Sequence, residues 1–191
     1  TDPDTAEEIS RFFKAAVRKS MAGNFDEAAH YYRRIIALNP KDARAYYYLG
    51  ILHIFQKRIG EAISCFKEAV KLNPEFYESH YNLAVASGII GDREGFFRYL
   101  DQCLRIKPDY YMAHNQLGLY FLKQGEIGNA IDHFRKALDY FPEFDEAHNN
   151  LAIALVQSGK KQEGLSHFRR ALQINPEYAE AKRNIEVYGK K

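Results

Sequence analysis

The sequence predicts an all-α protein in which short helix pairs stack side by side into an α-solenoid. Five of the six prolines recur every 34 residues, and a leucine and a glycine keep the same interval. Within each interval the apolar residues are three and four positions apart, which is the spacing of one helix face. The recurring prolines are Pro40, Pro74, Pro108, Pro142 and Pro176. Several residue types held in one phase indicate an array of equivalent structural units.

Each interval is expected to contain two helices. In the second interval, Leu49 and His53 lie on one face of a first helix, and Ala62 and Phe66 lie on one face of a second. Pro74 follows the second helix and ends it, because proline cannot continue the backbone hydrogen-bond ladder. A helix pair this short buries its apolar stripes only by stacking on neighbouring pairs. Five pairs and a final helix give about 11 helices in total.

The two ends have features of caps. Thr5 followed by Glu8 has the spacing of a capping box, so the first helix is predicted to begin near Ala6. A last helix is predicted after Pro176, with a polar outer side that keeps the end of the array soluble. The residues expected on its inner face are Ala181, Ile185 and Tyr188.

The repeating unit has a recognisable motif. The second unit reads Tyr46-x2-Leu49-Gly50-x2-His53, then Ala62-x3-Phe66, then Pro74, and the fourth reads His114-x2-Leu117-Gly118-x2-Phe121, then Ala130-x3-Phe134, then Pro142. This pattern resembles the tetratricopeptide repeat, whose unit reads W-x2-L-G-x2-Y, A-x3-F, P. The resemblance implies a right-handed superhelix and a single domain over residues 1–191. Its repeats are 9–42, 43–76, 77–110, 111–144 and 145–178, followed by a capping helix over 179–189.

The third repeat departs from the pattern. Phe96 stands where other repeats have alanine, Leu100 replaces the aromatic residue, and Cys103 replaces another alanine. We expect Gly95 to make room for Phe96 and the distance or angle between helices to change locally. Ordinary sequence drift within a repeat is the alternative.

No catalytic motif stands out in the sequence. A glycine-rich phosphate loop and a G-x-S-x-G elbow are both absent, so the sequence predicts neither enzymatic activity nor a cofactor. Cys65 and Cys103 fall on phases that are normally buried, which predicts inert thiols. His80, His114 and His148 recur every 34 residues and are predicted to pack as large planar residues. Metal binding and a pH-sensitive seam remain alternatives for these histidines.

Charge and hydropathy narrow the possible partners. The net charge is +2, and basic residues do not form a stripe across the repeats, so nucleic-acid binding is not expected. No stretch without Asp, Glu, Lys or Arg is longer than the 13 residues of 79–91, which is shorter than the roughly 18 residues that a membrane span needs. Direct membrane insertion is therefore not expected. The compartment stays open, with the cytoplasm favoured and a periplasmic or membrane-tethered parent protein as alternatives.

The resemblance implies that the first helix of each repeat lines a concave groove. The ninth position of each repeat is aliphatic throughout: Val17, Ile51, Val85, Leu119 and Ile153. The N-terminal half adds aromatic anchors with basic neighbours: Phe13, Tyr47, Tyr48, Phe55 and Tyr81, with Lys14 and Arg44. The C-terminal half adds a run of amides: Asn82, Asn115, Gln116, Asn149 and Asn150. Side-chain amides hold a peptide backbone through both N–H and C=O, as in the asparagine ladder of some family members. The alternative is that the amides are solvated helix surface and the tyrosines pack between helices.

These features predict a non-catalytic scaffold that binds a protein or an extended peptide in the groove. The two-carboxylate clamp of chaperone-tail binders is not expected, because Glu78 and Glu146 stand where that clamp needs basic residues. A recruiting or self-associating domain of a larger enzyme or membrane protein is the main alternative, and Thr1 in place of Met fits a fragment or a processed product. Homo-oligomerisation through the aromatic groove or an end helix is a further possibility.

Overall fold

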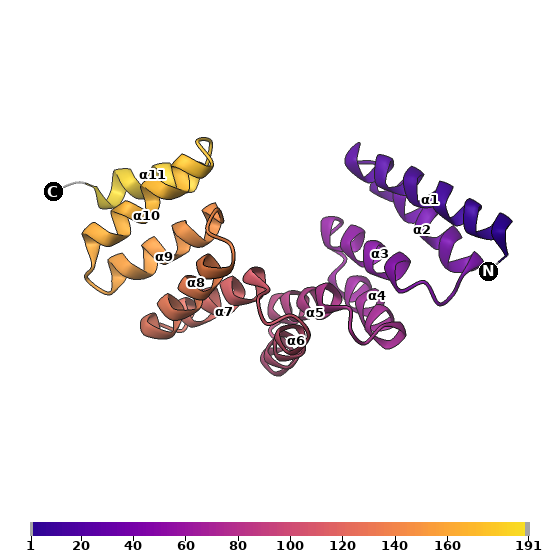
Figure 1. Cartoon of the computed structure of the whole chain (residues 1–191), viewed down its shortest axis with the longest axis horizontal. Coiled ribbons are helices and arrows are strands. Elements are labelled where there is room, and N and C mark those ends of the chain that lie inside the picture. Colours follow the sequence, from indigo (N-terminus) through magenta and orange to yellow (C-terminus); the bar gives the residue numbers. More distant parts are fainter. Residues whose placement is uncertain (1, 190–191) are drawn as a thin grey trace. The chain divides into compact units, whose positions relative to one another are not determined.

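The computed structural model describes residues 2–189, which form eleven α-helices and contain no β-strand (Figure 1). The predicted all-α helical repeat fold is confirmed. By its internal contacts the chain divides into two compact units, residues 1–106 and 107–191, called here the N-terminal and the C-terminal unit. The single domain expected over residues 1–191 stays a prediction.

Helices of each unit pack against their neighbours in chain order (Figure 1). The N-terminal unit contains α1 (Pro3–Met21), α2 (Phe25–Leu38), α3 (Ala43–Phe55), α4 (Ile59–Leu72), α5 (Tyr77–Ile89) and α6 (Arg93–Ile106). The C-terminal unit contains α7 (Tyr111–Lys123), α8 (Ile127–Tyr140), α9 (Asp145–Gln157), α10 (Lys161–Ile174) and α11 (Ala179–Tyr188). Each 34-residue interval therefore contains one helix pair, as the spacing predicted.

The first helix begins earlier than the sequence predicted. Helix α1 starts at Pro3, and its N-cap is Asp2. The Asp2 carboxylate accepts a hydrogen bond from the Thr5 backbone N–H at 3.0 Å and another from the Thr5 hydroxyl at 2.6 Å. The predicted start near Ala6 is wrong because an aspartate cap followed by proline at the first helical position is a stronger start signal.

Glycine lets the two helices of a pair approach closely. A Cβ atom at Gly50 would lie 2.7 Å from the Phe66 ring, and one at Gly118 would lie 2.5 Å from the Phe134 ring. Both rings are fully buried at the centre of their helix pairs. The glycine of the motif is therefore required because the second-helix aromatic ring occupies the space of its side chain.

The third repeat accommodates its extra phenylalanine through a different glycine from the predicted one. Phe96 is buried, and a Cβ atom at Gly88 on the facing helix α5 would lie 3.2 Å from its ring. Gly95 lies instead against Asp92 and Ser87, and its N–H donates to the Asp92 carboxylate. The large and small residues of this helix pair have changed places, so Gly88 makes the room that we predicted for Gly95.

The turn between the helices of a pair needs a left-handed backbone conformation. Gly23, Gly91, Gly125 and Gly159 adopt φ values from +76° to +85° at this point. In the second repeat the same point is occupied by Lys57, which adopts φ +59°. A side chain makes this conformation costly, so the second repeat contains a strained turn residue.

The C-terminal helix caps the array as predicted. Ala181 is fully buried, and Ile185 and Tyr188 pack on the buried cluster that includes Phe168. The rings of Tyr188 and Phe168 stack with centroids 6.0 Å apart. Helix α11 therefore covers the apolar face that the last helix pair would otherwise expose.

Candidate functional site

Within each unit, neighbouring first helices touch through the fifth residue of one repeat and the sixth residue of the next. In the N-terminal unit this contact is aromatic: the edge of the Phe13 ring meets the Tyr48 ring, with centroids 6.2 Å apart. Tyr48 also stacks on the buried Tyr32 at 5.6 Å. The Arg44 guanidinium lies 5.0 Å from the Phe13 ring centroid and forms an ion pair with Asp42 at 3.1 Å. Helices α1 and α3 are thus joined by an edge-to-face contact between aromatic rings.

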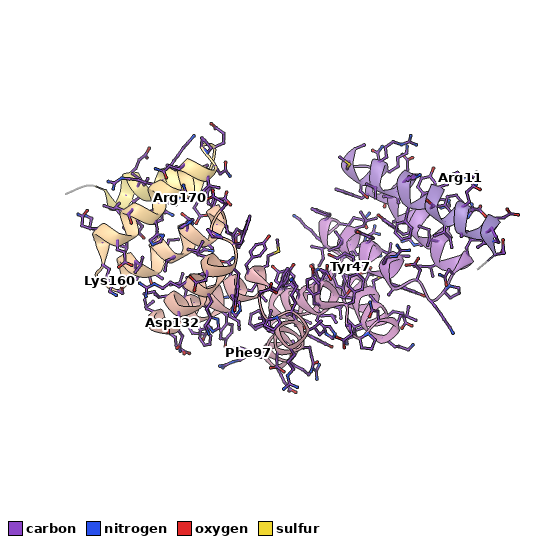
Figure 2. The ribbon with its side chains drawn as sticks, in the orientation of Figure 1. Arg11, Tyr47, Phe97, Asp132, Lys160 and Arg170 are labelled. Atoms are coloured by element: carbon purple, nitrogen blue, oxygen red, sulfur yellow. The ribbon has the colours of Figure 1, made fainter. Side chains whose placement is uncertain are left out.

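The next contact in this unit is mixed. Tyr47 of α3, which is labelled in Figure 2, packs against Phe66 and Phe76. It also forms a side-chain hydrogen bond with Asn82 of α5. Burial raises the pKa of Tyr47 to about 12, so its hydroxyl stays protonated at neutral pH. The Asn82 amide also donates to the Glu78 carbonyl at 2.8 Å. These two predicted site residues therefore connect first helices.

Large apolar side chains gather on the exposed face of α1 and α3. Val17 is 44% exposed, Met21 85% and Phe55 63%. A hollow of about 360 Å³ between the two helices is lined by these three residues together with Tyr48 and Ile51 among others. A second hollow, of about 680 Å³, lies along α1 beside Phe13, Val17 and Met21. We call this surface the apolar groove and define it by Phe13, Val17, Met21, Tyr48, Ile51 and Phe55.

The C-terminal unit uses amides at the same contact. The side-chain Nδ2–H of Asn150 in α9 donates to the side-chain Oδ1 of Asn115 in α7 at 3.1 Å, and the Asn115 Nδ2–H donates to the Glu146 carboxylate at 3.2 Å. The Asn184 Nδ2–H of α11 donates to the side-chain Oδ1 of Asn149 at 2.9 Å. Asn115 and Asn149 are at most 2% exposed, so these amides act between helices of the chain.

The remaining predicted site residues are spread along the first helices. Lys14 is exposed beside the apolar groove. The half-buried ones are Tyr81, Val85, Gln116, Leu119 and Ile153. The sequence analysis did not single out Met21, the most exposed of the large apolar residues. Its signal is the thirteenth position of the repeat, where Phe55 and the exposed Ile89 follow it.

The recurring histidines are packed, and their partners lie in the second helix of the same repeat. The Nε2–H of His148 donates to the Pro142 carbonyl at 3.0 Å, which leaves its Nδ1 to accept a hydrogen bond from Nδ1–H of His167 at 2.9 Å. His114 and His133 repeat this arrangement at 3.5 Å. Burial lowers the pKa of all four rings, and that of His133 to about 4. Both pairs are therefore neutral at pH 7.

Three further features of residues 2–189 bear on catalysis, metal binding and membrane insertion. Burial raises the pKa of the Cys65 thiol to about 11 and that of the Cys103 thiol to about 12, which makes both poor nucleophiles. Among these residues no group of three or more His, Cys, Asp or Glu side chains is placed to hold a metal ion. None of the described helices combines the length and apolar character that crossing a bilayer requires.

Comparison with known proteins points to one family. Three family models, each described as tetratricopeptide repeat, match residues 21–87, 77–110 and 115–179. A search of curated proteins finds no significant match.

Solved structures share the fold at low sequence identity. The MamA protein is 22% identical over 97% of this chain and 98% of its own, with a TM-score of 0.69. A thermophilic TPR protein from Thermus thermophilus is 22% identical over 94% of this chain and 98% of its own, with a TM-score of 0.74. YrrB, described as a TPR protein with an unusual peptide-binding site, is 19% identical over 92% of this chain and 90% of its own, with a TM-score of 0.64.

Proposed function

Because the chain belongs to the tetratricopeptide repeat family, we propose that it is a non-catalytic scaffold whose apolar groove binds a segment of a partner protein. The main support for this proposal is that large apolar side chains of the groove are exposed to solvent. Side chains such as Met21 and Phe55 are more than half exposed and line hollows beside one another. Contiguous apolar surface of this kind typically marks an interaction site on a soluble protein. The peptide-binding site named for YrrB supports the same kind of role in a protein of this fold.

The proposal uses a subset of the predicted site residues. Phe13, Tyr48 and Ile51 belong to the apolar groove, and Lys14 and Arg44 stand beside it. Asn115, Asn149 and Asn150 are assigned a different role, because hydrogen bonds within the unit already use the Asn115 amide group, the Asn150 Nδ2 and the Asn149 Oδ1. A partner is therefore expected to gain most of its binding energy from apolar burial rather than from backbone hydrogen bonds.

Selection from a random peptide library tests the proposal. The library is selected on the wild-type chain, and each selected peptide is then measured against Met21→Glu/Phe55→Glu and against Val187→Glu. Val187 is 64% exposed on α11, which makes its variant a control for a charge added to an exposed apolar site. Circular dichroism confirms that both variants remain helical.

We expect the selected peptides to lose binding to the groove variant by about tenfold or more and to keep binding to the control. Peptides that bind both variants as tightly as the wild type would contradict the proposal. The control also separates a groove effect from a general effect of added negative charge.

A further inference from the structure

The exposed face of α1 has the form of a helix-packing ridge. Phe13, Val17 and Met21 are spaced by four residues and so form one row along the helix. Val17 and Met21 line both hollows of the apolar groove, so the row separates the two hollows. A row of this spacing with a hollow on each side is the surface against which a second helix packs its own rows.

The walls of the apolar groove favour a helix over an extended strand. The surface of both hollows is almost entirely carbon. The Ser20 hydroxyl, which lines one of them, already donates to the Ala16 carbonyl at 2.9 Å. An extended peptide would bring unpaired N–H and C=O groups to this surface, which costs free energy. A helix satisfies its own backbone groups and presents only side chains.

One rim of the groove is basic. Lys14 and Arg18 are exposed and line the larger hollow, and neither forms an ion pair within residues 2–189. A neighbouring hollow along α1 is lined by the same two residues with Arg11 and Glu7, and Arg11 forms an ion pair with Glu8 at 3.8 Å, so Lys14 and Arg18 remain the unpaired cations there. This charge distribution favours a partner with acidic residues along one flank.

From these observations we infer that the apolar groove binds an amphipathic α-helix of a partner protein. The apolar residues of that helix lie on both sides of the Phe13–Val17–Met21 row, and its acidic residues face Lys14 and Arg18. The inference rests on the proposed function and names the class of partner. Helix α11 of a second copy of this chain is a less suitable occupant of the apolar groove. Its flank carries both acidic and basic residues: Glu180, Lys182, Arg183 and Glu186.

Three synthetic peptides test the inference by fluorescence anisotropy with the full chain. All three carry leucine at the same helical positions i, i+3, i+4 and i+7. The first carries glutamate along one flank, the second carries lysine at those positions, and the third is the glutamate peptide with a central proline that prevents a continuous helix. We expect the glutamate helix to bind about tenfold more tightly than either of the others.

Charge reversal at the rim provides the matched variant. Lys14→Glu/Arg18→Glu is expected to reverse the preference between the glutamate and lysine helices. The control Lys67→Glu/Arg169→Glu changes the net charge equally at exposed positions outside the groove, and it should keep the wild-type preference for the glutamate helix. Both variants are checked by thermal unfolding. Equal binding of the glutamate and lysine helices, or equal binding of the proline peptide, would overturn the inference.

A third variant separates this inference from the proposed function. Val17→Glu/Met21→Glu alters the row itself. If the library peptides lose binding to this variant but the best of them are extended or lack acidic residues, the inference fails and the groove remains a binding site. If no peptide depends on Val17 and Met21, the proposed function fails as well.

Discussion

The two units make the same helix contact with different chemistry. In the N-terminal unit Phe13 meets Tyr48 ring to ring, whereas in the C-terminal unit Asn115 and Asn150 form a hydrogen bond. Rings hold neighbouring helices through apolar area, part of which stays exposed, and Tyr48 is 41% exposed. Amides need direct hydrogen bonds, and burial makes each lost bond costly. The comparison indicates that the repeat position sets the contact and that the residue type decides whether surface remains for a partner.

Acidification is expected to produce the largest difference in stability between the two units. In the C-terminal unit burial lowers the pKa of four histidines: His114, His148, His167 and His133, the last to about 4. In the N-terminal unit burial lowers the pKa of His53. The unfolded histidines titrate near pH 6.5, so below that pH the unfolded state binds more protons. Stability is thus complete above about pH 6.5 and falls as the pH drops toward 4. His133 alone accounts for a loss on the order of 2 kcal/mol at pH 5.

Hydrogen exchange at pH 7.5 and pH 5, corrected for intrinsic rates, measures this difference. Protection of α7–α10 should fall more than protection of α1–α4. The matched variant His114→Phe/His133→Tyr copies the Phe12–Tyr31 ring contact, which occupies the same positions in the first repeat, and should reduce the acid sensitivity. An equal loss of protection in both units would contradict the assignment.

Removal of one amide is expected to have the next largest effect. Asn115→Ala leaves the buried amide of Asn150 without its acceptor, which costs about 1–3 kcal/mol of unfolding free energy. Urea unfolding followed by circular dichroism measures the change. Gln157→Ala, at an exposed position at the end of α9, serves as the control. A change below about 0.5 kcal/mol in Asn115→Ala would show that these amides do not hold the helices together.

The left-handed turn residue can be substituted reciprocally in the two units, lysine to glycine in one and glycine to lysine in the other. Lys57→Gly should stabilise the chain by about 0.5–1 kcal/mol, because glycine relieves the left-handed conformation at some cost in backbone entropy. The reverse change, Gly125→Lys at the same position of the fourth repeat, should destabilise it by a similar amount. Thermal unfolding measures both variants. If Lys57→Gly lowers the stability, the turn of the second repeat is not strained.

A charge in the apolar groove is expected to have the smallest effect on stability. Met21 is 85% exposed, so Met21→Glu should change the unfolding free energy by less than about 0.5 kcal/mol while it weakens peptide binding. Urea unfolding and anisotropy with the same protein separate the two effects. A large loss of stability would mean that Met21 serves the fold rather than a partner.

Most of the fold is predictable from the sequence because residues that recur at the same position mark each repeat. Proline ends each of the five intervals, and leucine and glycine each recur in four of them, which together locate the helix pairs that the structure contains. The start of α1 is an exception, since Thr5 and Glu8 have a capping spacing while Asp2 and Pro3 provide the cap. A local motif does not show which of two overlapping start signals the chain uses.

The surface is less predictable because it depends on how closely neighbouring helices approach. Asn115 is the fifth residue of its repeat and Tyr48 the sixth of its own, and both take part in the contact between first helices, yet Asn115 is 2% exposed and Tyr48 41%. Repeat phase gives the direction of a side chain but not the distance to the next repeat. The partner of His114 was missed for a similar reason: His133 lies in the second helix, and only the packed pair brings them together.

Hydrogen exchange with and without a bound peptide tests whether partners bind at the apolar groove of α1 and α3. The chain is measured alone and with a saturating peptide from the library selection, and added protection is mapped onto the helices. If partners bind at the apolar groove, protection increases in α1 and α3, around Val17, Met21 and Phe55, and is unchanged in α7 and α9. Added protection confined to α7 and α9 would place the binding surface on the amide-linked helices and contradict the proposed function.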